Sequence, residues 1–294
     1  MREKVLVTGA TGKVSSDVVR RLRSRGVDVK AGTRQPTEGR RRFGDDVEVV
    51  ELDYEQTDTW DGAVEWADRV FLVPPPFDPN ADEMLEPFVE WAVASKVRHI
   101  VVLSAMAITQ YDDMALNRVE RALLDSEVRH TILRPNLFMQ NFGAEGELQG
   151  MWRALHRTRG AVEVPAGEAR VSFVDARDVA EVAAEALTGQ EEHWERIHTL
   201  TGPEPLSFRE ALDRITEAGG GAIRYRPVEE AHFADVLRGL HWPKDRTEAV
   251  LSLFQSVREG RREEVVPDLQ ELLDHPPGTF DAYAREVAGS WRTE

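Results

Sequence analysis

A glycine-rich turn near the start of the chain, in VLVTGATGKVSSDVVRRL, is the feature that most constrains its fold. A short apolar run leads into the turn and an amphipathic stretch leads out of it, which predicts a strand, a turn and a helix. Gly9 and Gly12 can adopt backbone angles that are closed to other residues, and they let a pyrophosphate approach closely. The helix is expected to open at about Lys13, with Thr11 before it and Val14 after it, so that its first N–H groups face the phosphate charge. These five residues form the predicted nucleotide site.

Position 15 is where this motif usually has a third glycine, and the chain has Ser15, which is small enough for close helix packing. A tight turn that binds no ligand is the alternative interpretation. Because strand, turn and helix follow one another in the right order, the nucleotide site is favoured.

The first two thirds of the chain alternate apolar runs with amphipathic stretches. The apolar runs are rich in Val, Ile and Leu and are expected to be parallel strands buried on both faces. They are Val5–Thr8, Val27–Gly32, Val47–Leu52, Val70–Val73, Ile100–Leu103, Thr131–Leu133 and Ile197–Leu200. The predicted helices between them are Val14–Ser24, Glu83–Ser95, Asp113–Asp125 and Arg177–Thr188. The alternation predicts a doubly wound α/β sheet, that is, a Rossmann fold.

The pattern becomes mostly helical after about residue 202, where helices are expected at Ser207–Ala218, Glu229–Gly239 and Asp245–Gly260. We therefore expect a nucleotide-binding core at 1–140, to which 168–200 returns. A smaller, mostly helical substrate-binding part would comprise 141–167 and 201–294.

The second predicted strand ends in AGTRQP, which bears on the choice of nucleotide. Chains that bind NAD usually have an acidic residue here to hold the ribose hydroxyls, and this chain has Thr33 and Arg34. An arginine suits a 2′-phosphate, so NADP(H) is the predicted cofactor. Asp53 follows the third strand and either reaches the adenine amino group or forms a turn. Pro74 begins a rigid proline run that is expected to form a wall along the cofactor.

Composition excludes several classes of function. The chain of 294 residues has no cysteine, which rules out disulfides, thiolate metal sites and cysteine nucleophiles and fits a reducing cytoplasm. Its net charge of −16 argues against non-specific binding to nucleic acid or to an anionic membrane. No apolar run approaches a membrane span, no signal peptide is seen, and the histidine spacings predict no metal site. The oligomeric state is left open.

With TGATGKVSS, AGTR, LSAMA and HTILRPNLFMQNF in register, the chain resembles the NmrA-like branch of the atypical short-chain dehydrogenases. The resemblance covers essentially the whole chain. It implies a Rossmann fold, bound NADP(H) and a substrate pocket beneath the C-terminal segment. Members of this branch include quinone and ketone reductases, reductases of aromatic natural-product pathways and non-catalytic redox sensors.

The usual acid of short-chain dehydrogenases, Tyr-x-x-x-Lys, is absent, because none of the four tyrosines has a lysine four residues later. Asn117 stands where the family's lysine aligns, and it can hydrogen-bond a ribose. Ser104 ends the fifth predicted strand, where the resemblance implies a serine that faces both cofactor and acceptor carbonyl. A serine that caps the local backbone is the alternative.

Aromatic and apolar residues gather after the sixth predicted strand and suggest a pocket for a flat aromatic substrate. The predicted substrate-binding residues are Met106, Tyr111, Phe138, Phe142, Trp152 and Phe173. The alternative is that most of them are simply core. Asn136 is expected to contact the nicotinamide carboxamide or the substrate.

These observations favour an NADPH-dependent reductase of an aromatic ketone or a quinone, in polyketide or antibiotic tailoring, whose substrate assists its own protonation. A sensor that binds NADP(H) without turnover is the main alternative. An epimerase or dehydratase is disfavoured because those reactions need a competent acid–base pair.

Overall fold

The computed structural model describes residues 2–106, 114–143, 161–189 and 191–292 of the chain. It divides into two compact units, and each is described by itself. The first unit comprises Met1–Arg134 and Val179–Thr199, and the second comprises Pro135–Asp178 and Leu200–Glu294.

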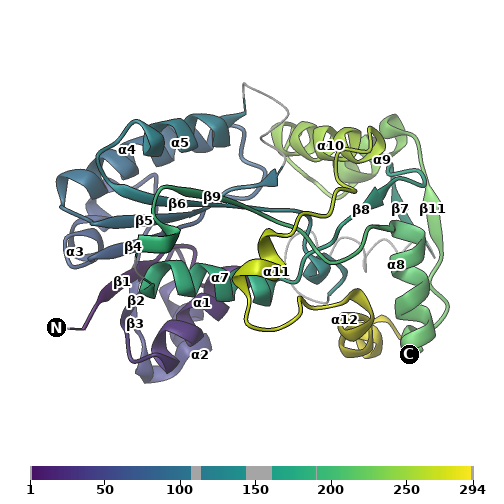
Figure 1. The fold of residues 1–294 in the computed structure, drawn as a ribbon. Coiled ribbons are helices and arrows are strands. Elements are labelled where there is room, and N and C mark those ends of the chain that lie inside the picture. Colours follow the sequence, from purple (N-terminus) through teal and green to yellow (C-terminus); the bar gives the residue numbers. More distant parts are fainter. Residues whose placement is uncertain (1, 107–113, 144–160, 190, 293–294) are drawn as a thin grey trace. The chain divides into compact units, whose positions relative to one another are not determined.

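The first unit is built on a seven-stranded sheet with the order β3-β2-β1-β4-β5-β6-β9 (Figure 1). The strands are β1 (Lys4–Val7), β2 (Asp28–Thr33), β3 (Glu48–Glu51), β4 (Arg69–Leu72), β5 (His99–Leu103), β6 (Arg129–Pro135) and β9 (Arg196–Leu200). The pairings from β3 through β6 are all parallel. The strand order reverses between β1 and β4, and such a switch point is where open α/β sheets bind ligands, at the carboxyl ends of the strands. The predicted Rossmann fold is confirmed.

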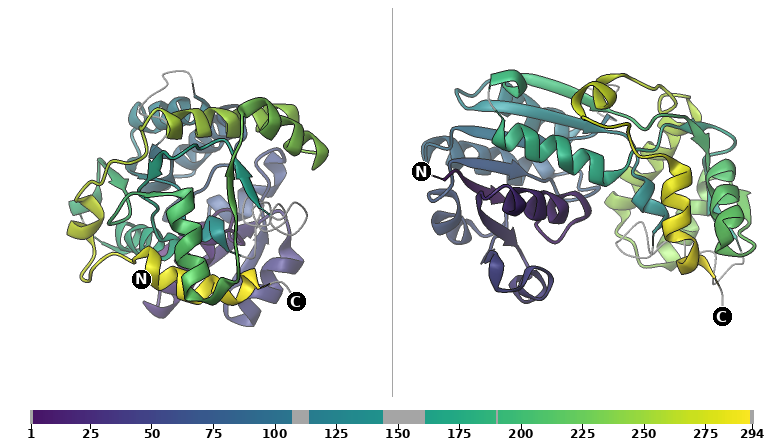
Figure 2. Two further views of the ribbon diagram at one scale, coloured as in Figure 1. Left: turned by 90° about the vertical axis from the view of Figure 1, so that its right-hand side faces the viewer. Right: turned by 60° about the horizontal axis from the view of Figure 1, so that its bottom comes forward.

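Helices cover both faces of this sheet (Figure 1). They are α1 (Lys13–Ser24), α2 (Pro36–Phe43), α3 (Asp61–Val64), α4 (Ala81–Ala94), α5 (Ala115–Leu124) and α7 (Ala176–Thr188). Helices α4 and α5 lie on one face, and α1 and α7 lie side by side on the other, as the right-hand view of Figure 2 shows. Ion pairs join Arg21 to Glu181, at 2.6 Å, and Arg25 to Glu185. Within the described residues, no helix is long and apolar enough to cross a membrane.

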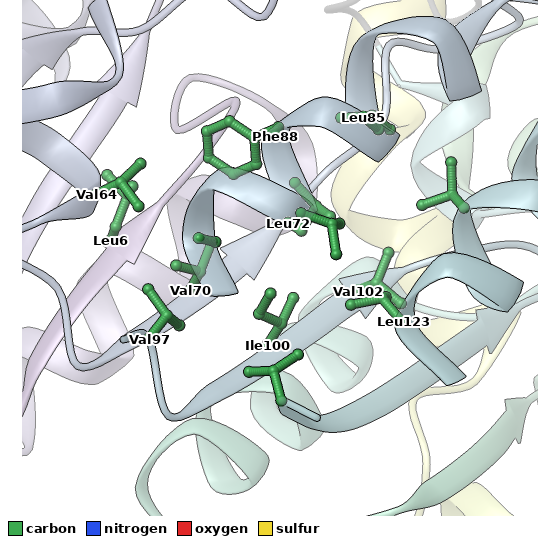
Figure 3. Close-up of a cluster of buried hydrophobic side chains, with 14 of the residues drawn as sticks. Leu6, Val64, Val70, Leu72, Leu85, Phe88, Val97, Ile100, Val102 and Leu123 are labelled. Carbon is green, nitrogen blue, oxygen red and sulfur yellow. The ribbon is translucent and has the colours of Figure 1, made fainter. Parts of the chain in front are cut away.

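The core between the sheet and α4 consists of aliphatic side chains around one phenylalanine (Figure 3). Phe88 of α4 is fully buried and meets the rings of Tyr54 and Trp60 edge to face, with ring centroids 5.1 and 5.3 Å away. Leu72 and Ile100 contribute from β4 and β5. Burying each such side chain contributes roughly 1.5–3 kcal/mol, so this core fixes the strand ends that carry the site.

The second unit has its own aromatic core and four short strands. Its elements are β7 (Val162–Val164), β8 (Arg170–Val171), β10 (Leu206–Ser207), β11 (Tyr225–Pro227), α8 (Phe208–Ile215), α9 (Glu230–Gly239), α10 (Lys244–Arg258), α11 (Asp268–Leu272) and α12 (Phe280–Val287). Helix α8 begins with a capping box between Ser207 and Glu210, which satisfies two N–H groups of its first turn. The sequence predicted the helical character of this part but not the pairs β8–β10 and β7–β11.

Candidate functional site

The glycine turn joins β1 to α1 and forms a cradle of backbone. Gly9 has a φ of +54°, an angle that side chains disfavour, and Gly12 donates its N–H to the Gly9 carbonyl at 2.8 Å. A Cβ on Gly12 would lie 3.1 Å from that carbonyl oxygen. The hydroxyl of Ser15 is buried beside the turn and has no hydrogen-bond partner among the described residues. The cradle therefore fits a pyrophosphate, which Gly9, Gly12 and the first N–H groups of α1, at Lys13 and Val14, would hold.

A hydrogen-bonded network ties together the strand ends beneath this cradle. The Thr8 hydroxyl donates to the Phe71 carbonyl at 2.9 Å and accepts from the Val73 N–H at 2.9 Å. The Tyr54 hydroxyl lies 2.7 Å from the Thr8 hydroxyl and 3.0 Å from the Val73 carbonyl. Burial raises the pKa of Tyr54, so this phenol keeps its proton and acts as a donor. The network holds the backbone just before Pro74 in place.

Tyr54 is a residue at the site that the sequence analysis missed. It follows β3 in VVELDYE, and a phenol so close to a strand end was the available signal. Its hydrogen bonds make it a support for the strand ends.

Arg34, just after the end of β2, is an exposed cation. Thr33 is buried, and its hydroxyl accepts the N–H of Gln35 at 3.1 Å. Arg34 is exposed and forms no ion pair with any residue that the structure describes. Arg41 pairs with Glu38 at 2.9 Å, whereas Arg42 donates to the Ser16 hydroxyl of α1 at 3.1 Å. Arg34 and Arg42 are thus the candidate cations for a phosphate on the ribose.

Asp53 uses its carboxylate within its own turn. It accepts hydrogen bonds from the Glu55 N–H at 3.2 Å and from the Gln56 side chain at 3.1 Å. Its backbone carbonyl accepts the indole N–H of Trp60 at 2.8 Å. Of the two alternatives for Asp53, this geometry favours the turn.

Ser104 directly follows β5. It is 6% exposed, and its N–H donates to the Leu133 carbonyl at 2.8 Å. Its hydroxyl has no hydrogen-bond partner among the described residues. Leaving a buried hydroxyl unpaired costs about 1–3 kcal/mol, so this group is suited to receive a partner from a ligand. The backbone-capping alternative for its side chain finds no support in the described contacts.

The other predicted residues beyond β5 differ in burial, and two of them are not described. Met106 is buried, with 5% of its surface exposed. Asn117 lies in the first turn of α5 and is half-buried. Tyr111 and Trp152 lie outside the described residues.

Three predicted residues have their side chains engaged or buried within the second unit. The amide of Asn136 donates to the Ser172 hydroxyl and the Arg262 carbonyl, both at 2.8 Å, and accepts the Leu137 N–H at 2.9 Å. Its hydrogen-bonding capacity is therefore used within the unit, which argues against a contact with nicotinamide or substrate.

Phe142 and Phe173 are core residues. They expose 0% and 1% of their surface and meet edge to face with ring centroids 5.2 Å apart. Each also contacts Phe280, with ring centroids 5.2 and 5.8 Å away respectively. The sequence could not separate this aromatic core from a pocket wall, because both need the same side chains. Phe138 is only half-buried and stays a candidate for substrate contact.

Comparisons with known proteins agree with this geometry. The family model described as NAD(P)H-binding matches residues 9–190. The chain is 35% identical to a (4-alkanoyl-5-oxo-2,5-dihydrofuran-3-yl)methyl phosphate reductase of Streptomyces griseus, over 99% of this chain and 100% of that protein. It is 30% identical to the prestalk A differentiation protein A of Dictyostelium discoideum, over 96% of this chain and 92% of that protein.

Among solved structures, the fold is similar to the NADPH-dependent quinone oxidoreductase QOR2 of Escherichia coli in complex with NADPH. The TM-score is 0.81 at 19% identity, and the match covers 96% of this chain and 99% of the other. The fold and the matches over nearly the full chain confirm the family that the sequence motifs indicated. The chain belongs to the NAD(P)H-binding family.

Proposed function

We propose that the chain is an NADPH-dependent reductase that transfers hydride to a conjugated carbonyl acceptor, an aromatic ketone or a quinone. The observation that carries the proposal is the buried, unpartnered hydroxyl of Ser104 at the end of β5, in the same unit as the glycine cradle. An acceptor carbonyl could take the hydrogen bond that this hydroxyl does not make within the described residues.

The cofactor preference rests on the end of β2. Arg34 is exposed and forms no ion pair with a described residue, so its guanidinium can grip a 2′-phosphate in a bidentate manner. Arg42, held at the start of α1, adds positive charge nearby. Asn117 can hydrogen-bond the nicotinamide ribose but, having no charge, cannot lower the pKa of a neighbouring phenol.

The missing Tyr-x-x-x-Lys pair limits the kind of acceptor. When bound, the reduced nicotinamide supplies the hydride. The anion left on the acceptor must then take a proton without a strong protein acid. A quinone gives a hydroquinone anion, which is stable enough to be protonated by water. An aryl ketone with a neighbouring phenol passes that proton to its own nascent alkoxide. The residues of the chain then need only to position the two reactants, which contributes up to about 7–11 kcal/mol.

The relative from Streptomyces griseus supports a conjugated acceptor. Its printed name describes a substrate with an unsaturated lactone and an alkanoyl group, whose reduction also leaves a delocalised anion. A role in polyketide or antibiotic tailoring is consistent with such acceptors and forms part of the proposal.

The test is anaerobic NADPH oxidation by the pure protein against a small panel of acceptors. The panel contains simple quinones, aryl ketones with a neighbouring phenol, the same ketones with that phenol methylated, and an alkanoyl butenolide phosphate. Turnover that disappears on methylation would support substrate-assisted protonation. Equal turnover of both ketones would show that the protein or water supplies the proton and would overturn that part of the proposal.

A redox sensor that binds NADP(H) without turnover is the second candidate, and the absent acid–base pair favours it. Tight NADPH binding with no oxidation by any acceptor in the panel would support it against the reductase. Ser104→Ala adds a discriminating variant. It should lower kcat while leaving the affinity for NADPH within about twofold if Ser104 binds the acceptor.

A further inference from the structure

A cavity opens at the amino ends of the strands of the first unit, on the edge of the sheet opposite the glycine cradle. The first residues of three neighbouring strands are Arg69 of β4, His99 of β5 and Arg129 of β6. These residues are paired in register, Arg69 with His99 and His99 with Arg129. Directly paired residues of parallel strands lie on the same face of the sheet, so their side chains gather at one place.

The cavity has a volume of about 260 Å³, enough for a small molecule or several waters. Its lining consists of Glu3, Arg69, Arg98, His99, Arg129, Thr188 and Trp194. Three guanidinium groups thus face one carboxylate, although the whole chain has a net charge of −16.

One of the arginines is a structural part of the wall. Arg69 is 8% exposed, and its guanidinium donates to the Leu187 carbonyl at 2.6 Å and the Gly189 carbonyl at 3.2 Å and pairs with Glu3. Glu3, the carboxylate among the described lining residues, is therefore already engaged.

The other two arginines are accessible. Arg98 is 59% exposed and lies 3.2 Å from Asp68. The guanidinium of Arg129 lies 3.7 Å from the centre of the Trp194 ring, and Arg129 forms no ion pair with any residue that the structure describes. Charge on this wall is thus left uncompensated.

The hydrogen bonds around His99 determine which of its two ring nitrogens carries the proton. Thr131 donates its hydroxyl to the His193 carbonyl at 2.7 Å, so its oxygen must accept from Nε2 of His99, 2.9 Å away. The Nδ1 atom is then a bare acceptor, and it has no partner among the described residues although His99 is 1% exposed. Burial and the neighbouring cations Arg69 and Arg129 lower the pKa of His99 to about 3, so the ring is neutral at pH 7.

Trp194 adds a donor. Its indole Nε1 atom is buried and has no hydrogen-bond partner in the described part of the chain. The lining therefore combines an unsatisfied donor at Trp194 and the exposed guanidinium of Arg129, which has no ion pair among the described residues, with an unsatisfied acceptor at His99.

We propose that this cavity binds a phosphate group that carries a proton, either as free hydrogen phosphate or on a small phosphate monoester. Its charged oxygens accept from Arg98, Arg129 and the Trp194 indole, and its P–O–H donates to Nδ1 of His99. Sulfate has the same shape but carries no proton at pH 7, so an oxygen lone pair would meet the lone pair of His99. The site is separate from the nucleotide cradle and does not rest on the proposed reduction.

The test is calorimetric titration of the full chain at pH 7 and constant ionic strength with inorganic phosphate, sulfate and methyl phosphate. Phosphate should bind about tenfold or more tightly than sulfate. Because methyl phosphate is mostly a dianion without a P–O–H at pH 7, it and inorganic phosphate are also compared at about pH 5.5, where both carry that proton. Equal affinities there would show that the cavity accepts a phosphate monoester, and much weaker binding of methyl phosphate would show that it takes free phosphate. Equal affinity for phosphate and sulfate would overturn the proposal.

Variants locate the binding. Arg129→Gln should weaken phosphate binding about tenfold or more, and Trp194→Phe, which keeps the ring but removes the N–H, about fivefold. Arg196→Gln, an exposed arginine at the start of β9 outside the lining, is the matched control. Arg34→Ala tests instead whether the measured phosphate binds at the proposed 2′-phosphate site of the nucleotide. An equal loss in Arg196→Gln and Arg129→Gln, or a loss only in Arg34→Ala, would contradict the site, provided thermal unfolding shows all variants folded.

Discussion

Alanine variants of Gly9 and Gly26 distinguish the effect of a positive φ on stability from the effect of the glycine on NADPH binding. Both have a positive φ, +54° and +76°, and a Cβ would clash with nothing at either position. Replacing either by alanine should therefore cost about 1 kcal/mol of unfolding free energy. Gly26 lies at the far end of α1, about 18 Å of helix from the cradle.

Only Gly9→Ala should weaken NADPH binding, because its Cβ faces the cradle. Urea unfolding and fluorescence titration with NADPH measure the two effects. Equal NADPH affinity in both variants would show that the turn does not hold the pyrophosphate.

We expect Arg34 to set the preference for NADPH over NADH through a single charge. Arg34→Ala should weaken NADPH binding by about 1.5–3 kcal/mol and leave NADH binding nearly unchanged, because only NADPH carries the 2′-phosphate. Titration with each nucleotide measures the ratio. Equal losses for both would place the 2′-phosphate elsewhere, with Arg42 the next candidate.

His99 makes stability depend on pH. Its pKa of about 3 in the folded chain lies below the ordinary value of 6.5, so the unfolded chain binds its proton first as pH falls. The contribution of His99 is therefore present above about pH 6.5 and is lost progressively toward pH 3, at up to about 1.4 kcal/mol per pH unit. Burial also lowers the pKa of His193, so its protonation destabilises the folded chain in the same pH direction.

His99→Asn should accordingly flatten the decline in unfolding free energy between pH 6.5 and 4. Urea unfolding in phosphate-free buffer measures this, and His241→Asn, at an exposed histidine, is the control. A variant with the same slope as the unmodified chain would show that His99 titrates normally.

At the scale of elements, α2 is a helix that is stabilised by its packing on β3 and has no apolar periodicity of its own. The segment PTEGRRRF has no apolar periodicity, and the sequence analysis did not predict it. Pro36 begins it at a position that suits proline, and Gly39 packs so closely on β3 that a Cβ would lie 2.7 Å from Val49. The helix depends on the absence of one side chain.

Gly39→Ala should therefore destabilise the chain by about 1–3 kcal/mol, despite the better helix propensity of alanine. Gly62 of α3 is the matched control, since a Cβ there meets no atom within 4 Å. Gly62→Ala should stabilise by up to about 1 kcal/mol. Thermal unfolding measures whether each variant is more or less stable than the unmodified chain. Stabilisation by Gly39→Ala would mean that α2 can move away from β3.

The sequence predicted every strand of the main sheet because buried parallel strands are continuous apolar runs. It placed the starts of β5 and β6 too late, at Ile100 and Thr131, because His99 and Arg129 are polar. Those polar residues line the cavity at the amino ends of the strands. The polar residues that interrupt the apolar pattern of the strands therefore coincide with the proposed phosphate site. The glycine turn could be predicted from the sequence because a positive φ favours glycine, so residue type and backbone angle are directly linked.

The rest of the site depended on tertiary contacts that no local pattern contains. Asn136 looked available for a cofactor, but its amide is satisfied by Ser172 and by the carbonyl of Arg262, distant in sequence. Tyr54 gains its role through Thr8, which follows β1, and through the carbonyl of Val73, which follows β4.

For the molecule as a whole, nucleotide binding should be visible as stability. A ligand that binds only the folded chain stabilises it by about 2.7 kcal/mol at a concentration of one hundred times its Kd. NADPH should raise the unfolding temperature accordingly, with much less effect from NADH at equal concentration. Calorimetric scans measure both, and an equal rise with the two nucleotides would contradict the assigned preference.

The first unit is discontinuous along the chain, since Val179–Thr199 returns to it after the excursion that starts at Pro135. During synthesis, β1 to β6 are therefore made before β9. Helix α1 is likewise made before α7, which carries the ion-pair partners of Arg21 and Arg25. At about 5–20 residues per second this delay lasts several seconds. The first unit is thus completed only after the shorter segment of the second unit, Pro135–Asp178, has been made. Until then, the growing chain has β6 as an exposed edge of the sheet.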